Sequence, residues 1–129
     1  MRLIALVLFL AMLSAGCAPR HYDALRPTSS VYTFEVQMMA PPVQMNKTQF
    51  LVQASDKQHR PVSGATVSLD LAMPGMDMGR NVVALKEMAA TPGSYTGTGR
   101  FPMAGDWQAT VSAERGAVQE SQTFPISVH

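Results

Sequence analysis

Apolar and polar residues alternate along most of the chain after residue 30. Within residues 31–38, one face of an extended chain carries only apolar side chains, those of Tyr32, Phe34, Val36 and Met38. A period of two residues is typical of a β-strand that buries one face. The same pattern, interrupted by proline, glycine and polar turns, predicts strands over 31–38, 48–54, 65–73, 82–88, 94–101, 106–114 and 117–128.

The spacing of these strands predicts an all-β fold. Seven short strands with frequent turns are typical of an immunoglobulin-like antiparallel β-sandwich, and a small closed barrel is the alternative. Trp107 is expected in the middle of the core because no other side chain in the chain fills as much volume. Pro125 lies on the opposite parity from Phe124, Ile126 and Val128, which indicates an edge strand or a bulge.

The N-terminal segment is typical of a bacterial export signal. Arg2 is followed by an apolar run of 11 residues over 3–13, which is too short to span a bilayer and fits the centre of a signal peptide. The residues Leu13-Ser14-Ala15-Gly16-Cys17 resemble the lipobox of bacterial lipoproteins, although Ser14 stands where leucine is commonest. An ordinary secretory signal with an incidental cysteine is the alternative.

The lipobox resemblance implies that the mature chain begins at Cys17 and carries lipid there. Ala18, rather than aspartate, follows the cysteine, which implies the periplasmic face of the outer membrane. Attached acyl chains would anchor the protein firmly to that membrane. The expected organisation is therefore a signal peptide over 1–16, the lipidated cysteine and a flexible tether over 17–30, and one β-sandwich domain over 31–129.

Composition narrows the possible functions. Removal of residues 1–16 takes away Arg2 and leaves nine basic and nine acidic side chains, so nucleic acid is not an expected partner. Cys17 is the single cysteine, which excludes an internal disulfide and a blue-copper site. The chain lacks a nucleophile elbow, a phosphate loop and a paired carboxylate motif, so we do not expect an enzyme.

The stretch Met73-Pro74-Gly75-Met76-Asp77-Met78-Gly79 is the most unusual in the chain. Thioethers are soft, neutral ligands that favour Cu(I), and they do not need to lose a proton to bind it. Met76 and Met78 would point the same way in an extended segment, with Met73 or Met103 as a third ligand. Met73 also continues the inward parity of its strand, and Met103 precedes Trp107, so both can equally be core residues.

Three pieces of the sequence resemble a known family. They are Pro61-Val62-Ser63-Gly64-Ala65-Thr66-Val67, then the methionine stretch, then Pro92-Gly93-Ser94-Tyr95 leading to Phe101-Pro102-Met103-Ala104-Gly105-Asp106-Trp107. Together they resemble the YtkA-like domain family and are similar to the FixH family. The resemblance implies a small extracytoplasmic β-sandwich associated with copper handling, oxidase assembly or metal efflux. It carries over Met73, Met76, Met78 and Met103 as the methionine positions and implies no catalytic residue.

Two functions are therefore expected from the sequence. The first is a lipid-anchored envelope protein that binds or delivers copper(I) through Met73, Met76, Met78 and Met103, with a metal-handling or efflux protein as its partner. The second is a protein-interaction module of the envelope that binds no metal, since methionine-rich loops also make adaptable binding surfaces. His21, His59 and His129 have no metal-ligand spacing to one another and are expected to be solvated.

Overall fold

The computed structural model describes residues 31–129, so the predicted signal peptide, Cys17 and the tether lie outside the described residues. Each predicted strand is present, and its bounds differ from the prediction by no more than two residues. The strands are β1 (Tyr32–Met38), β2 (Lys47–Asp56), β3 (Thr66–Ala72), β4 (Val82–Glu87), β5 (Ser94–Arg100), β6 (Gly105–Arg115) and β7 (Val118–Val128). Within residues 31–129, no helix is long and apolar enough to cross a membrane.

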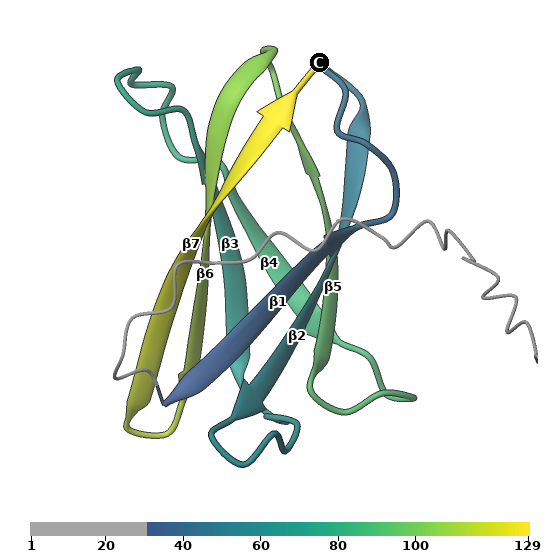
Figure 1. Cartoon of the computed structure of the whole chain (residues 1–129), viewed down its shortest axis with the longest axis vertical. Coiled ribbons are helices and arrows are strands. Elements are labelled where there is room, and N and C mark those ends of the chain that lie inside the picture. Colours follow the sequence, from purple (N-terminus) through teal and green to yellow (C-terminus); the bar gives the residue numbers. More distant parts are fainter. Residues whose placement is uncertain (1–30) are drawn as a thin grey trace, which may run out of the picture.

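All strand pairs are antiparallel, in the order β1-β2-β5-β4-β3-β6-β7. This single sheet folds over, so that β1, β2 and β5 form one layer and β3, β6 and β7 form the other (Figure 1). The prediction of an antiparallel β-sandwich is thereby confirmed. β7 is an edge strand, and the edge position tolerates Pro125, which has no N–H to give to a further strand.

β4 passes from one layer to the other. Its residues 82–85 pair with β3, whereas only Lys86 and Glu87 pair with β5, opposite Thr96 and Tyr95. Glycines in β5 make this crossing possible. A Cβ on Gly97 would lie 2.6 Å from Leu85 Cδ2, and one on Gly99 would lie 3.0 Å from Val83 Cγ2. The inward side chains of β4 therefore pack directly on bare backbone of β5.

The core follows the predicted alternation. The inward residues of β2, β3, β6 and β7 are all buried: Phe50, Val52, Ala54, Val67, Leu69, Leu71, Trp107, Ala109, Val111, Ala113, Phe124, Ile126 and Val128. Trp107 is buried as predicted, with its ring 5.3 Å from that of Phe101 in an edge-to-face arrangement. It lies near the start of β6, however, towards one end of the core rather than in its middle.

Tyr95 and Glu87 tie together the loops at the end of the sandwich where β2 ends and β3 begins. The Tyr95 hydroxyl donates to the Val62 carbonyl at 2.8 Å and accepts from the Ala65 N–H at 3.1 Å. The Glu87 carboxylate accepts the N–H groups of Gly93 at 2.9 Å and Gly64 at 3.0 Å. These bonds join the β2–β3 and β4–β5 connections, which are far apart in sequence.

The hydrogen bonds to Glu87 predict a pH effect on stability. The N–H groups of Gly93 and, next, Gly64 lower the pKa of the Glu87 carboxyl below its ordinary value. The bonds are therefore fully stabilising above the pKa of an unfolded glutamate, about 4.3. Their contribution is lost as the pH falls from there through the lower folded pKa.

We expect Glu87→Gln to melt at a temperature that changes less between pH 7 and pH 3 than that of the unmodified chain. Thermal unfolding followed by circular dichroism at a series of pH values measures this difference. Asp56→Asn is a useful comparison because the pKa of Asp56 is also lowered, chiefly by the Arg60 N–H. Identical pH profiles for Glu87→Gln and the unmodified chain would contradict the prediction.

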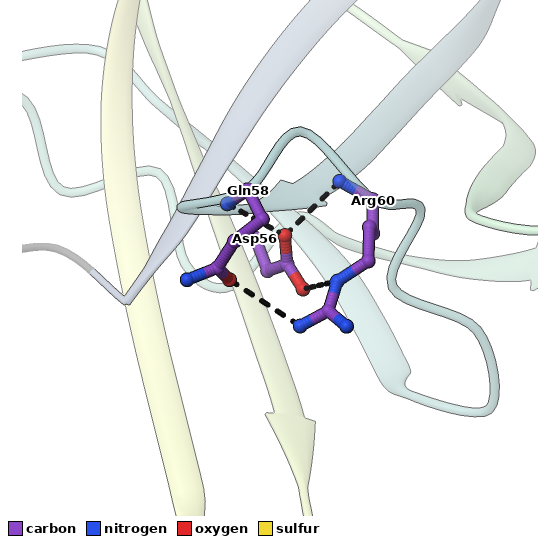
Figure 2. A network of polar contacts seen from close by, with 3 residues as sticks. All are labelled: Asp56, Gln58 and Arg60. Carbon is purple, nitrogen blue, oxygen red and sulfur yellow. Dashed lines mark hydrogen bonds and ion pairs between the residues drawn. The ribbon is translucent and has the colours of Figure 1, made fainter.

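The β2–β3 turn is ordered by Asp56 (Figure 2). Its Oδ1 accepts the N–H groups of Gln58 at 2.9 Å and Arg60 at 3.0 Å, and its Oδ2 accepts Arg60 Nε at 3.0 Å. His59 lies in this exposed turn with a positive φ of 61°, and its N–H donates to the Asp56 carbonyl. The polar residues here therefore shape a turn.

Candidate methionine site

Three connections and the C-terminus lie at the opposite end of the sandwich, where β1, β3, β5 and β7 all finish (Figure 1). Met45 N–H donates to the Phe101 carbonyl at 2.8 Å, and Gln44 N–H donates to the His129 carbonyl at 2.9 Å. Seven of the eight methionines in residues 31–129 lie here, and only Met88 lies at the other end. We call this region the methionine end.

The stretch over 73–79 is held by its own backbone. Met76 N–H donates to the Met73 carbonyl at 3.2 Å across Pro74 and Gly75, and Gly75 has a φ of 80°. Proline followed by a residue of positive φ is the pattern of a type II turn. The Asp77 carboxylate accepts the Gly79 N–H at 3.2 Å and so helps to fix the shape of the loop. The loop therefore has a defined shape without burying Met76 or Met78.

The four predicted methionine ligands differ in their environment. Met73 is half-buried against the core, and its Cε lies close to Gly105, where an added Cβ would be 3.0 Å away. Its surroundings are those of a packing residue. Met76 is 51% exposed, Met78 is 37% exposed and Met103 is 38% exposed. The Met103 carbonyl accepts Trp107 Nε1–H at 3.0 Å, which fixes the backbone of the β5–β6 connection under the buried indole.

A hollow of about 300 Å³ lies at the methionine end. Its apolar walls come from Met78, Trp107 and Met45, the last of which was not among the predicted ligands. Of the four predicted ligands, Met78 is the one that lines this hollow. Met45 has a positive φ of 63° and lies in the β1–β2 connection, 33 residues before Met78. Consecutive strands run in opposite directions, which places the first, third and fifth connections at one end. This alternation is the sequence signal that could have placed Met45 near Met78.

The charges around the hollow are positive. Arg80 and Arg100 line it together with Asn81, whose Nδ2 donates to the Arg100 carbonyl at 3.0 Å. No carboxylate is among the residues that line it. Across residues 31–129, no three His, Cys, Asp or Glu side chains are grouped so as to hold a metal ion. The thioethers are the soft ligands at this end, and the neighbouring guanidinium groups would oppose the charge of a bound cation.

Comparison with known proteins supports the sequence resemblance. The model of a family described as YtkA-like matches residues 26–112, which contain β1 to β5 and most of β6. All three pieces of sequence that carried the resemblance fall within this match. The comparison with curated proteins gave no match.

Proposed function

The chain belongs to the YtkA-like family, and on this premise we propose that it binds or delivers copper(I) at the cell envelope through its methionine end. The observation that carries the proposal is the exposure of Met76 and Met78 in a loop whose shape is set by backbone hydrogen bonds. Core packing does not account for two large apolar side chains kept in solvent at this position. Soft thioether ligands account for them, because they favour Cu(I).

The ligands in this proposal are Met76 and Met78, with Met73 or Met103 as the third sulfur. Met103 is the better candidate, since it is exposed, whereas Met73 packs against the core. The donor set is neutral, so binding should depend little on pH. Arg80 and Arg100 lie close by and would weaken the hold on a cation, which favours exchange of copper over storage.

The proposal includes a lipid anchor at Cys17 and an envelope metal-handling or efflux protein as the partner. The described chain starts at the end of the sandwich opposite the methionine end, where β1 begins (Figure 1). An anchor that precedes β1 would thus leave the methionine end free to meet a partner. Mass spectrometry of the protein extracted from membranes should find acyl chains on Cys17, and an unmodified Cys17 would remove the anchor from the proposal.

The experiment that tests copper binding is a competition titration with Cu(I) and a chromogenic chelator. The chain from residue 18 contains the whole of the described fold and is suitable for it. We expect one Cu(I) ion to be taken from the chelator by each chain, equally well at pH 6 and pH 8. Failure to compete even with weak chelators would contradict the proposal.

A protein-interaction module that binds no metal is the second candidate. The hollow lined by Met45, Met78 and Trp107 favours it, because flexible methionine side chains adapt to a partner's apolar groups. A partner recovered equally from envelope extracts with and without a copper chelator would support this function. Loss of the partner when copper is removed would favour copper delivery instead.

A further inference from the structure

We propose that the gap between β4 and β5 at the methionine end binds an extended, acidic segment of a partner protein. The two strands are paired only at Lys86–Thr96 and Glu87–Tyr95, and they diverge towards the methionine end (Figure 1). A hollow of about 410 Å³ lies between residues 82–84 of β4 and residues 98–100 of β5. We call this hollow the wedge.

The wedge exposes a strand edge of β5. Residues 97–100 pair with β2 on one side, but beyond Thr96 no strand of the described chain pairs with β5 on the other. The Arg100 carbonyl faces the wedge, where it accepts Asn81 Nδ2–H at 3.0 Å. Peptide groups two residues apart point to the same edge of a strand, so those of Thr98 also face the wedge. An added extended segment can hydrogen-bond to them, as in β-augmentation.

The side chains around the wedge are basic. Lys47 and Arg100 line it, and Arg80 lines the adjoining hollow. All three are exposed, and among residues 31–129 their side chains make no ion pair or hydrogen bond with other residues. Neither the wedge nor the adjoining hollow has an acidic residue in its lining. The nearby acid Asp77 accepts the Gly79 N–H, and Asp70 lies opposite Val82 in the β3–β4 pair without lining the wedge. The residues that line the two hollows therefore carry only positive charge.

Lys47 and Arg100 are directly opposite each other in the β2–β5 pair. Like charges at directly opposite positions destabilise a sheet, so this pair lowers the stability of the fold on its own. A carboxylate placed between the two side chains would convert the repulsion into two charge-assisted hydrogen bonds. This complementarity identifies the occupant as acidic.

The wedge continues into the methionine hollow, since Asn81 and Arg100 line both. A segment that extends along β5 would thus reach the apolar walls formed by Met45 and Met78. The occupant that fits is an extended segment with carboxylates opposite the wedge and one apolar side chain at the end nearest the methionines. The proposal concerns a protein partner and does not depend on copper.

The test uses an array of octapeptides on which the chain from residue 18 is bound in the presence of a Cu(I) chelator. The array holds peptides with Asp or Glu at alternate positions, and matched peptides with Asn or Gln and with Lys at the same positions. We expect acidic peptides with a terminal Leu or Met to bind best. Arg100→Glu should weaken them about tenfold or more. Lys57→Glu, an equal charge change in the β2–β3 turn, should leave them unchanged.

Backbone NMR supplies the second readout. The bound peptide should shift the amide resonance of Thr98, because that group gains a hydrogen bond. Binding of neutral or basic peptides as well as acidic ones, equal weakening by both charge variants, or no binding by any peptide would each overturn the proposal. So would binding to phosphatidylglycerol vesicles with no peptide binding, which would make the basic surface a lipid contact. Because the chelator is present throughout, these outcomes are independent of copper binding.

Discussion

Replacing Met76 and Met78 together with leucine is expected to weaken Cu(I) binding by more than about a hundredfold, equivalent to about 2.8 kcal/mol. Leucine keeps the apolar volume but removes the sulfur, so it tests ligation without opening a cavity. Both side chains are exposed and the loop is shaped by backbone hydrogen bonds. The free energy of unfolding should therefore change by no more than about 0.5 kcal/mol. Chelator competition and thermal unfolding on the same samples measure the two effects.

Met88→Leu is the matched control for this prediction. Met88 is 38% exposed, almost the same as Met78, but it lies after β4 at the opposite end of the sandwich. The control should bind Cu(I) as the unmodified chain does. The copper proposal is falsified if the double variant binds Cu(I) normally and melts at a much lower temperature, because the two methionines would then be packing residues.

Met73→Leu and Met103→Leu then identify the third sulfur. The half-buried Met73 packs against the core beside Gly105, so its replacement should change the melting temperature more than it changes copper affinity. Met103 is 38% exposed and lies at the same end of the sandwich as the loop over 73–79. We expect its replacement to act chiefly on affinity.

The fold was predictable because one face of nearly every strand is apolar at every second residue. In β6, for example, Trp107, Ala109, Val111 and Ala113 are buried and the residues between them are more exposed. β4 is the strand that crosses between the layers. The crossing of β4 depends on the absence of Cβ atoms at Gly97 and Gly99 of β5. The pattern of apolar residues within β4 gives no sign of this dependence.

The candidate site was only partly predictable. The methionine stretch stands out in the sequence, and Met76 and Met78 are exposed, whereas Met73 packs against the core. Met45 was missed because its place beside Met78 depends on which connections share an end of the sandwich. The positive charge around the two hollows was missed for the same reason, since Lys47, Arg80 and Arg100 are distant in sequence. They come from β2, the β3–β4 connection and β5.

The structure also separates the roles of the three pieces of sequence that carried the family resemblance. The piece over 61–67 and the piece over 92–95 contact each other through Tyr95 and Val62 and through Gly93 and Pro61. The piece over 101–107 is held by the Phe101–Trp107 ring contact and by the Trp107–Met103 hydrogen bond. Packing thus explains these pieces apart from the exposed Met103 side chain, whereas Met76 and Met78 have no comparable structural role. That contrast is the reason for placing the function in the loop over 73–79.

Gly93→Ala is expected to destabilise the fold by about 2–5 kcal/mol, through left-handed backbone strain and a steric clash. Gly93 has a φ of 83°, and an added Cβ would lie 2.5 Å from Pro61 Cβ and 3.0 Å from Pro61 Cα. Relief of that contact requires movement of the β2–β3 connection, which is also tied by the Glu87 and Tyr95 hydrogen bonds. The melting temperature should fall by roughly 10–30 °C, measured by circular dichroism.

Gly64→Ala separates the two causes. Gly64 has a similar φ of 72°, but nothing lies within 4 Å of an added Cβ. It should therefore cost only the backbone strain, about 1–2 kcal/mol. Equal destabilisation by the two variants would show that Pro61 gives way easily and that the contact between the two pieces is not what holds this end together. A larger loss for Gly93→Ala, with Cu(I) affinity unchanged below its melting temperature, would show instead that this end maintains the fold while the methionine end acts separately.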